Sequence, residues 1–244
     1  MNRINQLNVK LFADGADLDS MLVLYKRPYI RGFTTNPTLM KKAGINNYEK
    51  FAKQVIEAIP DRPVSFEVFA DELSDMSAQA KVIASWGSNV NVKIPVTNTK
   101  GIFTGPIIRE LSATGVKLNI TAVFTLKQVR LIAENLFLDT PAIISVFAGR
   151  IADTGRDPLP IMSECVEILK DLHKAELLWA SPRELLNIIQ ANEIGCHIIT
   201  ATPDVLGKLK LLEKDLSEFS RETVQMFFND ATTAGYIINT QGIT

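Results

Sequence analysis

Short apolar runs that alternate with helix-like segments along nearly the whole chain constrain its fold more than any other feature. Such runs, bounded by turn residues and often rich in Val and Ile, are typical of buried strands. The eight runs cover residues 9–13, 30–34, 64–68, 90–94, 116–121, 142–147, 177–180 and 197–201. Between them, apolar residues recur at helical spacing, as in Tyr48, Phe51, Val55, Ile56 and Ile59. Strands that alternate with helices pair in parallel through right-handed crossovers, so the pattern predicts an α/β fold.

The number of repeating units separates the two common parallel architectures. The chain has 244 residues, close to the roughly 250 that are typical of a (β/α)8 barrel. No G-x-G-x-x-G turn follows the first run, which argues against a doubly wound sheet. Because no linker or break in composition appears, we expect a single (β/α)8 TIM barrel domain over residues 1–244.

The end of the chain carries more helix than one barrel crossover requires. We expect an extended C-terminal helix over about residues 217–244, with Phe219, Val224, Met226, Phe227 and Phe228 as its large apolar side chains. This helix either packs under the barrel or docks on a neighbouring subunit. Both arrangements bury the aromatic rings, and we slightly favour the second.

Composition excludes several classes of function. The net charge is -1 with acids and bases evenly spread, which argues against nucleic acid as a partner. No run of 18 apolar residues predicts a membrane span, and the first residues lack the apolar core of a secretory signal. Cys165 and Cys196 are too few for a disulfide framework, so the cytoplasm is the default location. Because His173 and His197 make no metal-ligand spacing with each other or with either cysteine, we expect no zinc site. We also expect no cofactor.

One lysine, Lys93, lies inside the fourth apolar run. Lysine is almost never fully buried without a partner, because desolvation disfavours its ammonium form. A neutral amine in a dry pocket can attack a carbonyl and form a Schiff base. The alternative is that Lys93 reaches solvent or forms an ordinary ion pair.

Polar residues gather where the predicted strands end, and this is the functional face of a parallel barrel. They are Asp14, Thr34, Asn36, Glu67, Asn119, Thr121 and Ser145, with Phe147 on the same face as Ser145. Each has an ordinary explanation, since Asp14 could begin a turn and Asn36 before Pro37 is a common helix start. Together they place carboxylates, amides and hydroxyls around Lys93, which favours a catalytic site.

Cationic residues follow the later strands. Arg150 comes after the sixth run, and Ser181 and Arg183 come after the seventh. Guanidinium groups near a helix N-terminus predict an anion site, and barrels often bind phosphate there. Alternatively, Ser181 opens a capping box with Glu184, and the arginines pair with surface carboxylates such as Asp153.

Five segments in this order resemble the transaldolase family, in particular its short-chain branch with fructose-6-phosphate aldolase-like proteins. They are Gly32-Phe-Thr-Thr-Asn-Pro-Thr38, Val92-Lys-Ile-Pro-Val96, Asn119-Ile-Thr-Ala-Val-Phe124, Ser145-Val-Phe-Ala-Gly-Arg-Ile151 and Ala180-Ser-Pro-Arg183. The resemblance implies a (β/α)8 barrel, metal-free Schiff-base chemistry on sugar phosphates, and a place in the pentose phosphate pathway. It also implies homo-oligomers built on the C-terminal helix, often decamers.

The resemblance assigns a role to each candidate. Lys93 is similar to the nucleophile that attacks the ketose C2 carbonyl, and Asp14 to the acid/base at the C4 hydroxyl. Glu67 and Thr121 resemble the pair that holds a catalytic water. The remaining assignments are Thr34, Asn36, Asn119 and Ser145 for the dihydroxyacetone hydroxyls, and Arg150, Ser181 and Arg183 for phosphate.

Two positions bear on the type of reaction. In the family, glutamine at position 67 and tyrosine at position 147 go with free aldolase activity, whereas this chain has Glu67 and Phe147. Phenylalanine offers no proton to release the enamine, so we expect transfer to an acceptor rather than release of dihydroxyacetone. A free aldolase and a non-catalytic sugar-phosphate-binding barrel stay open as alternatives. Trp179 and Pro182 depart from the family pattern, which leaves an unusual deoxy or sulfonated ketose open as well.

Overall fold

The computed structural model describes residues 3–239 and 241, and its strands form a closed parallel barrel. In this described part of the chain, eight strands pair in sequence order and β8 closes on β1. Their bounds are β1 (Lys10–Asp14), β2 (Ile30–Thr34), β3 (Val64–Glu67), β4 (Val90–Pro95), β5 (Leu118–Val123), β6 (Ala142–Val146), β7 (Ala175–Trp179) and β8 (Ile198–Ala201). The predicted (β/α)8 barrel is therefore confirmed.

Of the predicted strand ranges only that of β2 matches at both ends; most of the others differ by one residue at an end, and β5 and β7 differ by two. β5 runs on to Val123, which pairs with Val146, and β7 begins at Ala175, which pairs with Ala142. Bonds to neighbouring strands set these ends, and residue type does not reveal them.

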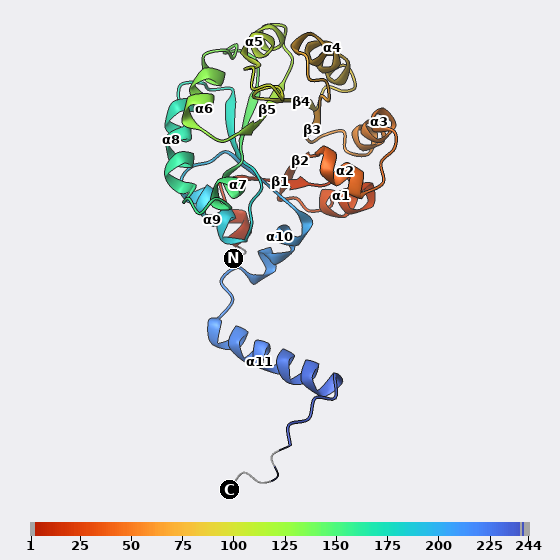
Figure 1. Ribbon diagram of the computed structural model, residues 1–244, viewed down its shortest axis with the longest axis vertical. Coiled ribbons are helices and arrows are strands. Elements are labelled where there is room, and N and C mark those ends of the chain that lie inside the picture. The colour runs from red at the N-terminus through yellow and green to blue at the C-terminus, as the bar shows by residue number, and fades with distance from the viewer. Residues whose placement is uncertain (1–2, 240, 242–244) are drawn as a thin grey trace. The chain divides into compact units, whose positions relative to one another are not determined.

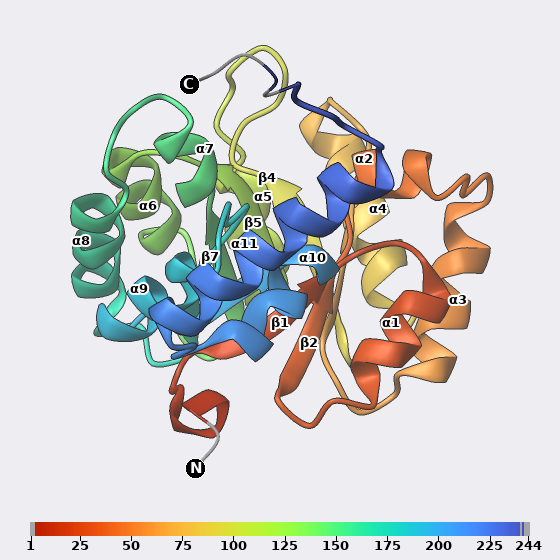
Figure 2. The same cartoon turned by 90° about the horizontal axis from the view of Figure 1, so that it is seen from below.

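Helices connect successive strands and lie outside the barrel, where they form a ring around it, and α10 follows the last strand (Figure 1). They are α1 (Leu18–Tyr25), α2 (Pro37–Lys42), α3 (Tyr48–Ala58), α4 (Leu73–Ala84), α5 (Gly105–Ala113), α6 (Leu126–Ala133), α7 (Ala148–Ala152), α8 (Leu159–Leu169), α9 (Leu186–Glu193) and α10 (Pro203–Gly207). Figure 2 shows β1 and β2 side by side in the barrel wall, with α1 and α3 outside them. The predicted apolar stripe on α3 is buried at Phe51 and Val55, as an amphipathic helix requires.

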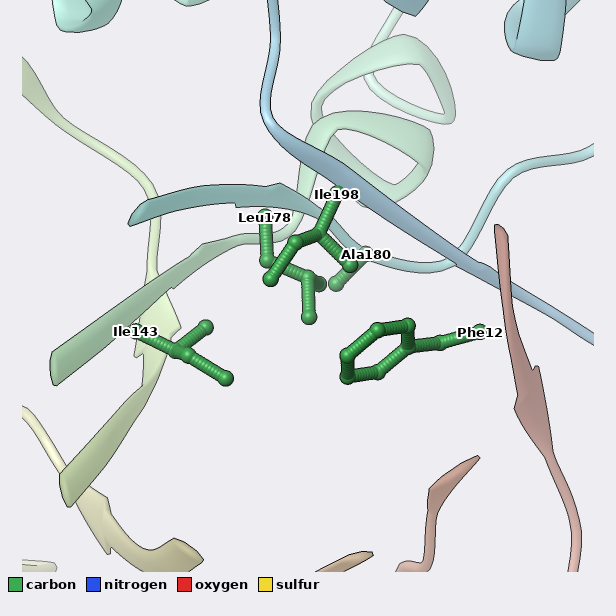
Figure 3. Close-up of a cluster of buried hydrophobic side chains, with 5 residues drawn as sticks. All are labelled: Phe12, Ile143, Leu178, Ala180 and Ile198. Carbon is green, nitrogen blue, oxygen red and sulfur yellow. The ribbon is translucent and has the colours of Figure 1, made fainter. Parts of the chain in front are cut away.

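An aromatic ring fills the middle of the barrel. Phe12 on β1 packs with Ile143 of β6, Leu178 of β7, Ala180 just after β7, and Ile198 of the adjacent β8 (Figure 3). Its ring occupies the space beside Gly32 on β2, because a Cβ there would lie 2.5 Å from the Phe12 Cζ. This cluster therefore fills the middle of the barrel and separates its two ends.

The chain divides into two compact units, residues 1–207 and residues 208–244. The second contains a short 3-10 helix (Lys208–Leu211) and the long helix α11 (Leu216–Thr233), whose N-cap Asp215 accepts a hydrogen bond from the Glu218 N–H. The predicted C-terminal helix is present, although it ends at Thr233, and residues 240 and 242–244 of the predicted extension lie outside the described residues. The description of the whole chain as one domain stays a prediction.

Along α11 large apolar side chains are exposed, including Val224, Met226, Phe227 and Phe228. Within the described residues, no helix combines the length and apolarity that crossing a membrane requires.

Candidate active site

Lys93 lies near the middle of β4 with its side chain inside the barrel, and only 7% of the residue is exposed. Its Nζ lies 3.0 Å from Glu67 Oε2 and donates a hydrogen bond of 2.6 Å to the Thr35 carbonyl. Glu67 faces Lys93 because the two residues are register partners on β3 and β4. The predicted burial of Lys93 is confirmed. The alternative that Lys93 forms an ion pair is confirmed as well, here with Glu67, because a buried ammonium group needs a carboxylate beside it.

Asp14, the last residue of β1, is a second carboxylate in the same interior. Its Oδ1 accepts from the Thr34 hydroxyl at 2.8 Å, and its Oδ2 accepts from the Asn36 amide at 3.3 Å. Burial raises the pKa of Asp14, while the charge of Lys93 and the two hydrogen bonds oppose that rise. A carboxyl group with a raised pKa is suited to accept and return protons nearer neutral pH.

Asn36 makes two contacts, and the helix start proposed for it from the sequence is confirmed. Its Oδ1 accepts from the Leu39 N–H at 2.9 Å and caps α2, while its Nδ2 contacts Asp14. The cap fixes the amide orientation, so the start of a helix aims a donor at the Asp14 carboxylate.

A line of hydrogen bonds crosses the opposite wall. Ser145 Oγ donates to Asn119 Oδ1 at 2.6 Å, and Asn119 Nδ2 donates to Ser65 Oγ at 3.1 Å. Thr121 is buried on the same strand as Asn119, and Ala122 after it has φ +58° where the β5–β6 register shifts. Such bulges re-aim side chains near functional sites, and this one lies beside Thr121.

These residues line one cavity of about 370 Å³ at the carboxyl-terminal ends of the strands. All predicted site residues but one line it: Asp14, Thr34, Asn36, Glu67, Lys93, Asn119, Thr121, Ser145, Phe147, Arg150 and Ser181. A larger cavity of about 730 Å³ opens at the other end of the barrel, beside Lys10 and Glu176, but the paired Lys93 and Glu67 and the buried Asp14 are not part of it. We therefore take the smaller cavity as the site, although the roles of its residues stay predictions.

Arg183 is the exception. Its guanidinium pairs with Asp153, with Nε 3.1 Å from Oδ1 and a second contact to Oδ2, and it does not line the cavity. The surface-pair alternative is therefore what the structure contains. Both side chains are about half exposed, where such pairs contribute only about 0–1 kcal/mol.

The predicted capping box at Ser181 is wrong. Helix α9 begins at Leu186, and Ser181 has φ +58°, which is not a helix-start conformation. The N–H groups of Arg183 and Glu184 instead donate to Asn187 Oδ1. Ser181 also packs tightly, because a Cβ on Gly149 would lie 1.5 Å from its carbonyl oxygen. These tertiary contacts decide the conformation of the segment.

Arg150, on α7, does line the cavity. Its guanidinium carbon lies 5.3 Å from the centre of the Phe147 ring, within the range of a cation–π contact. Phe147 thereby holds the one arginine that faces the cavity among the predicted site residues.

Trp179, which departs from the family pattern, does not shape the cavity directly. It is fully buried and does not line the cavity. Leu178 on β7 and Ala180 just after it belong to the interior cluster, so Trp179 between them faces the other side of the wall.

Sequence reasoning missed three contributors. Thr200 on β8 lines the cavity, and its hydroxyl oxygen lies 2.5 Å from that of Thr34. It shares a face with Ile198, so strand alternation could have found it. The other two are the Thr35 carbonyl, which accepts from Lys93, and the Tyr48 hydroxyl, which contacts the Glu67 main chain. Nothing in the sequence indicates either contact.

The two cysteines and His197 lie outside the proposed site, in surroundings that give them a structural role. Burial raises the pKa of Cys165 and of Cys196 to about 12, so both thiols are inert. His197 Nδ1 accepts from the Leu177 N–H at 3.0 Å, and burial lowers its pKa. Over residues 3–239 and 241, no group of three or more His, Cys, Asp or Glu side chains is placed to hold a metal ion.

Comparison with known proteins decides the family. A sequence model described as "Transaldolase/Fructose-6-phosphate aldolase" matches residues 11–241. The chain belongs to this family. Among transaldolase/fructose-6-phosphate aldolase relatives, a "Probable transaldolase" of Dehalococcoides mccartyi is 35% identical over 82% of this chain and 90% of its own length. A "Probable transaldolase 2" of Listeria monocytogenes is 32% identical over 88% of this chain and 95% of its own.

A solved structure agrees with the barrel found in this member of the family. The crystal structure of KGPDC from Streptococcus mutans has a TM-score of 0.53 and 10% sequence identity, covering 80% of this chain and 87% of that chain. At this identity the likeness concerns the fold alone.

Proposed function

We propose that the chain is a transaldolase that moves a dihydroxyacetone unit from a ketose phosphate to an aldose phosphate through a Schiff base on Lys93. The observation that carries the proposal is the Lys93 amine, buried in the cavity 3.0 Å from Glu67 and sharing that cavity with the buried carboxyl of Asp14. The family and the named relatives support it. Fructose 6-phosphate and sedoheptulose 7-phosphate represent the donor class.

The first half of the reaction forms the imine. Lys93 must give up a proton before its nitrogen attacks the ketose C2, and Glu67 is placed to accept that proton. Water leaves from the resulting carbinolamine with a proton returned by Glu67, through a water held by Glu67 and Thr121. The product is a protonated imine, which can accept an electron pair.

The second half breaks and remakes a carbon–carbon bond. Asp14 takes the proton of the C4 hydroxyl, the C3–C4 bond breaks, and its electron pair moves into the imine to give an enamine. The aldose leaves, and an acceptor aldehyde takes its place. The enamine carbon then attacks that aldehyde, Asp14 returns the proton, and hydrolysis frees Lys93.

Substrate contacts follow from the walls of the cavity. Asn119, Ser145, Thr34 and Asn36 offer amides and hydroxyls to the dihydroxyacetone part. Arg150 and Ser181, which line the cavity, would bind the phosphate, and Arg183 can join them only by leaving Asp153. Phe147 carries no proton for the enamine, which favours transfer over release of free dihydroxyacetone.

Borohydride trapping tests the Schiff base. The protein is incubated with fructose 6-phosphate and borohydride, and the modified peptide is mapped by mass. An adduct on Lys93 is expected, whereas no adduct at saturating donor favours the non-catalytic binding barrel.

Donor cleavage measured with and without erythrose 4-phosphate tests the transfer. We expect turnover to depend on the acceptor, and equal turnover without it favours the free aldolase. A panel that includes deoxy and sulfonated ketoses then identifies the donor.

We also propose that α11 mediates homo-oligomer formation, with a decamer as one expected assembly. Val224, Met226, Phe227 and Phe228 are exposed along it, and apolar surface of this kind favours a protein partner. Sedimentation of the full chain against a variant with Phe227→Ser and Phe228→Ser tests the proposal, and an unchanged mass rejects it.

A further inference from the structure

The ladder between β2 and β3 stops just before the Glu67 end of β3. Its last bond runs from the Thr35 N–H to the Ser65 carbonyl at 3.2 Å. In a continued parallel ladder, the next bond would run from the Glu67 N–H to the Thr35 carbonyl. That carbonyl instead accepts from Lys93 Nζ at 2.6 Å. The amine of Lys93 has therefore taken a main-chain acceptor that the sheet would otherwise use.

The next hydrogen bond of the ladder cannot form, because the residue that would donate it is a proline. A continued ladder would place the N–H of residue 37 on the Glu67 carbonyl, but residue 37 is proline and has no N–H. Both main-chain groups of Glu67 on this side thus lose their regular partners. Buried main-chain groups need replacements, because an unpaired one is costly.

Tyr48, the first residue of α3, supplies both replacements with a single oxygen. The Glu67 N–H donates to Tyr48 Oη at 2.6 Å, and the Tyr48 hydroxyl donates to the Glu67 carbonyl at 3.0 Å. The hydroxyl can serve both because it is one donor and two acceptors. Burial raises the pKa of Tyr48, so the proton that this second bond needs stays in place.

Aromatic neighbours fix the ring of Tyr48. It meets Phe66 edge-on with centroids 6.1 Å apart and Trp86 edge-on at 5.5 Å, and it lies 4.7 Å from Phe69. Such contacts leave the ring little freedom to turn. The hydroxyl is thus held at one point relative to the end of β3.

We propose that Tyr48 is a positioning residue that sets the Glu67 carboxylate against Lys93 and leaves the Thr35 carbonyl for the Lys93 amine. This inference rests on the proposed Schiff-base function. Without the hydroxyl, the Glu67 N–H competes with Lys93 for the Thr35 carbonyl, and the end of β3 shifts. The residues proposed to contact the donor, Asn119, Ser145 and Arg150, are on β5, β6 and α7 and not at the end of β3 that Tyr48 contacts.

The test compares Tyr48→Phe with a matched control, Tyr25→Phe. The control removes a hydroxyl that contacts Asp61 at 2.6 Å, and neither Tyr25 nor Asp61 lines the site cavity. With full chains and fructose 6-phosphate as donor, Tyr48→Phe should lose kcat by about tenfold or more, as expected for a misplaced proton-transfer group, while KM changes by less than about twofold. Tyr25→Phe should keep both constants. A Tyr48→Phe kcat within twofold of wild type overturns the proposal.

A double-mutant cycle with Glu67→Gln checks that Tyr48 acts through Glu67. We expect the Tyr48→Phe loss to shrink in the Glu67→Gln background, because the carboxylate that it positions is gone. An equal loss in both backgrounds overturns the proposal. Borohydride trapping distinguishes failure of the Tyr48 proposal from failure of the proposed function. If wild type forms no adduct, the Schiff-base function is rejected. If the adduct forms equally fast in wild type and Tyr48→Phe, only the role of Tyr48 is rejected.

A second variant covers the case in which Tyr48→Phe does not fold. Site-specific 3,5-difluorotyrosine at position 48 keeps the ring and makes the phenol more acidic. The Glu67 carbonyl should then lose its donor at lower pH, and activity should fall at lower pH than in wild type. An alkaline limb that does not move overturns the proposal.

Discussion

Glu67 and Lys93 are register partners on adjacent strands, and their charged atoms lie 3.0 Å apart inside the barrel. A strand pair fixes the two Cα positions, so the contact does not depend on a flexible loop. It joins the nucleophile and its proton acceptor in the proposed reaction.

Replacing Lys93 should abolish turnover without unfolding the chain. Lys93→Met keeps an unbranched side chain of similar length in the interior, so the barrel should survive. We expect donor turnover to fall by at least about 10³-fold and the borohydride adduct to disappear. Lys117→Met, at the other end of the barrel, is the control and should keep both. Measurable turnover by Lys93→Met would contradict the role.

Asp14→Asn should stabilise the fold at neutral pH while lowering activity. Because burial raises the folded-state pKa of Asp14 above 3.8, its ionised form destabilises the native state at neutral pH. That destabilisation fades as pH falls through the folded pKa and is gone below about 3.8. The gain in free energy of unfolding should therefore be largest near pH 7 and vanish in acid, and turnover should fall about 10²-fold or more.

Asp17→Asn is the control, and its effect on the free energy of unfolding should have the opposite sign. Hydrogen bonds from Ser20 lower the pKa of Asp17, so its charge contributes stability that is present above pH 3.8 and lost as pH falls through the folded pKa. Urea unfolding across pH measures both variants. A gain for Asp14→Asn that does not change with pH would contradict the sign worked out for Asp14.

Glu67→Gln combined with Phe147→Tyr should shift the reaction toward free dihydroxyacetone. The added phenol supplies a proton to the enamine, and the ratio of release to transfer should rise about tenfold or more. Phe124→Tyr is the control, because its ring lies 5.7 Å from Phe147 but outside the cavity. An unchanged product ratio in the double variant would reject our explanation of transfer.

Gly32→Ala should destabilise the barrel. Its Cβ would lie 2.5 Å from the Phe12 ring, which is held by Ile143 and Ile198 and has little room to move. We expect a loss of about 1–3 kcal/mol in the free energy of unfolding by urea, typical of overpacking. Gly207→Ala is the control, since nothing lies within 4 Å of its added Cβ. Equal stability of the two variants would contradict the packing argument.

The amino-acid sequence by itself determined the barrel and most of the residues in its cavity. Alternation in strands is local, so Asn119 and Thr121 must share a face wherever the strand goes. A closed parallel barrel then brings all carboxyl-terminal strand ends together, which places Asp14, Glu67 and Lys93 in one cavity.

Only the tertiary structure decided how individual polar groups are paired. Arg183 turns to Asp153, and Ser181 adopts φ +58° against Gly149 instead of capping a helix. In the sequence Tyr48 is one more apolar position on a predicted helix. In the structure its hydroxyl accepts from the Glu67 N–H and donates to the Glu67 carbonyl. These pairings join residues far apart in the chain at distances near 3 Å, and a periodic pattern fixes which face a side chain occupies but not the atom that it meets there.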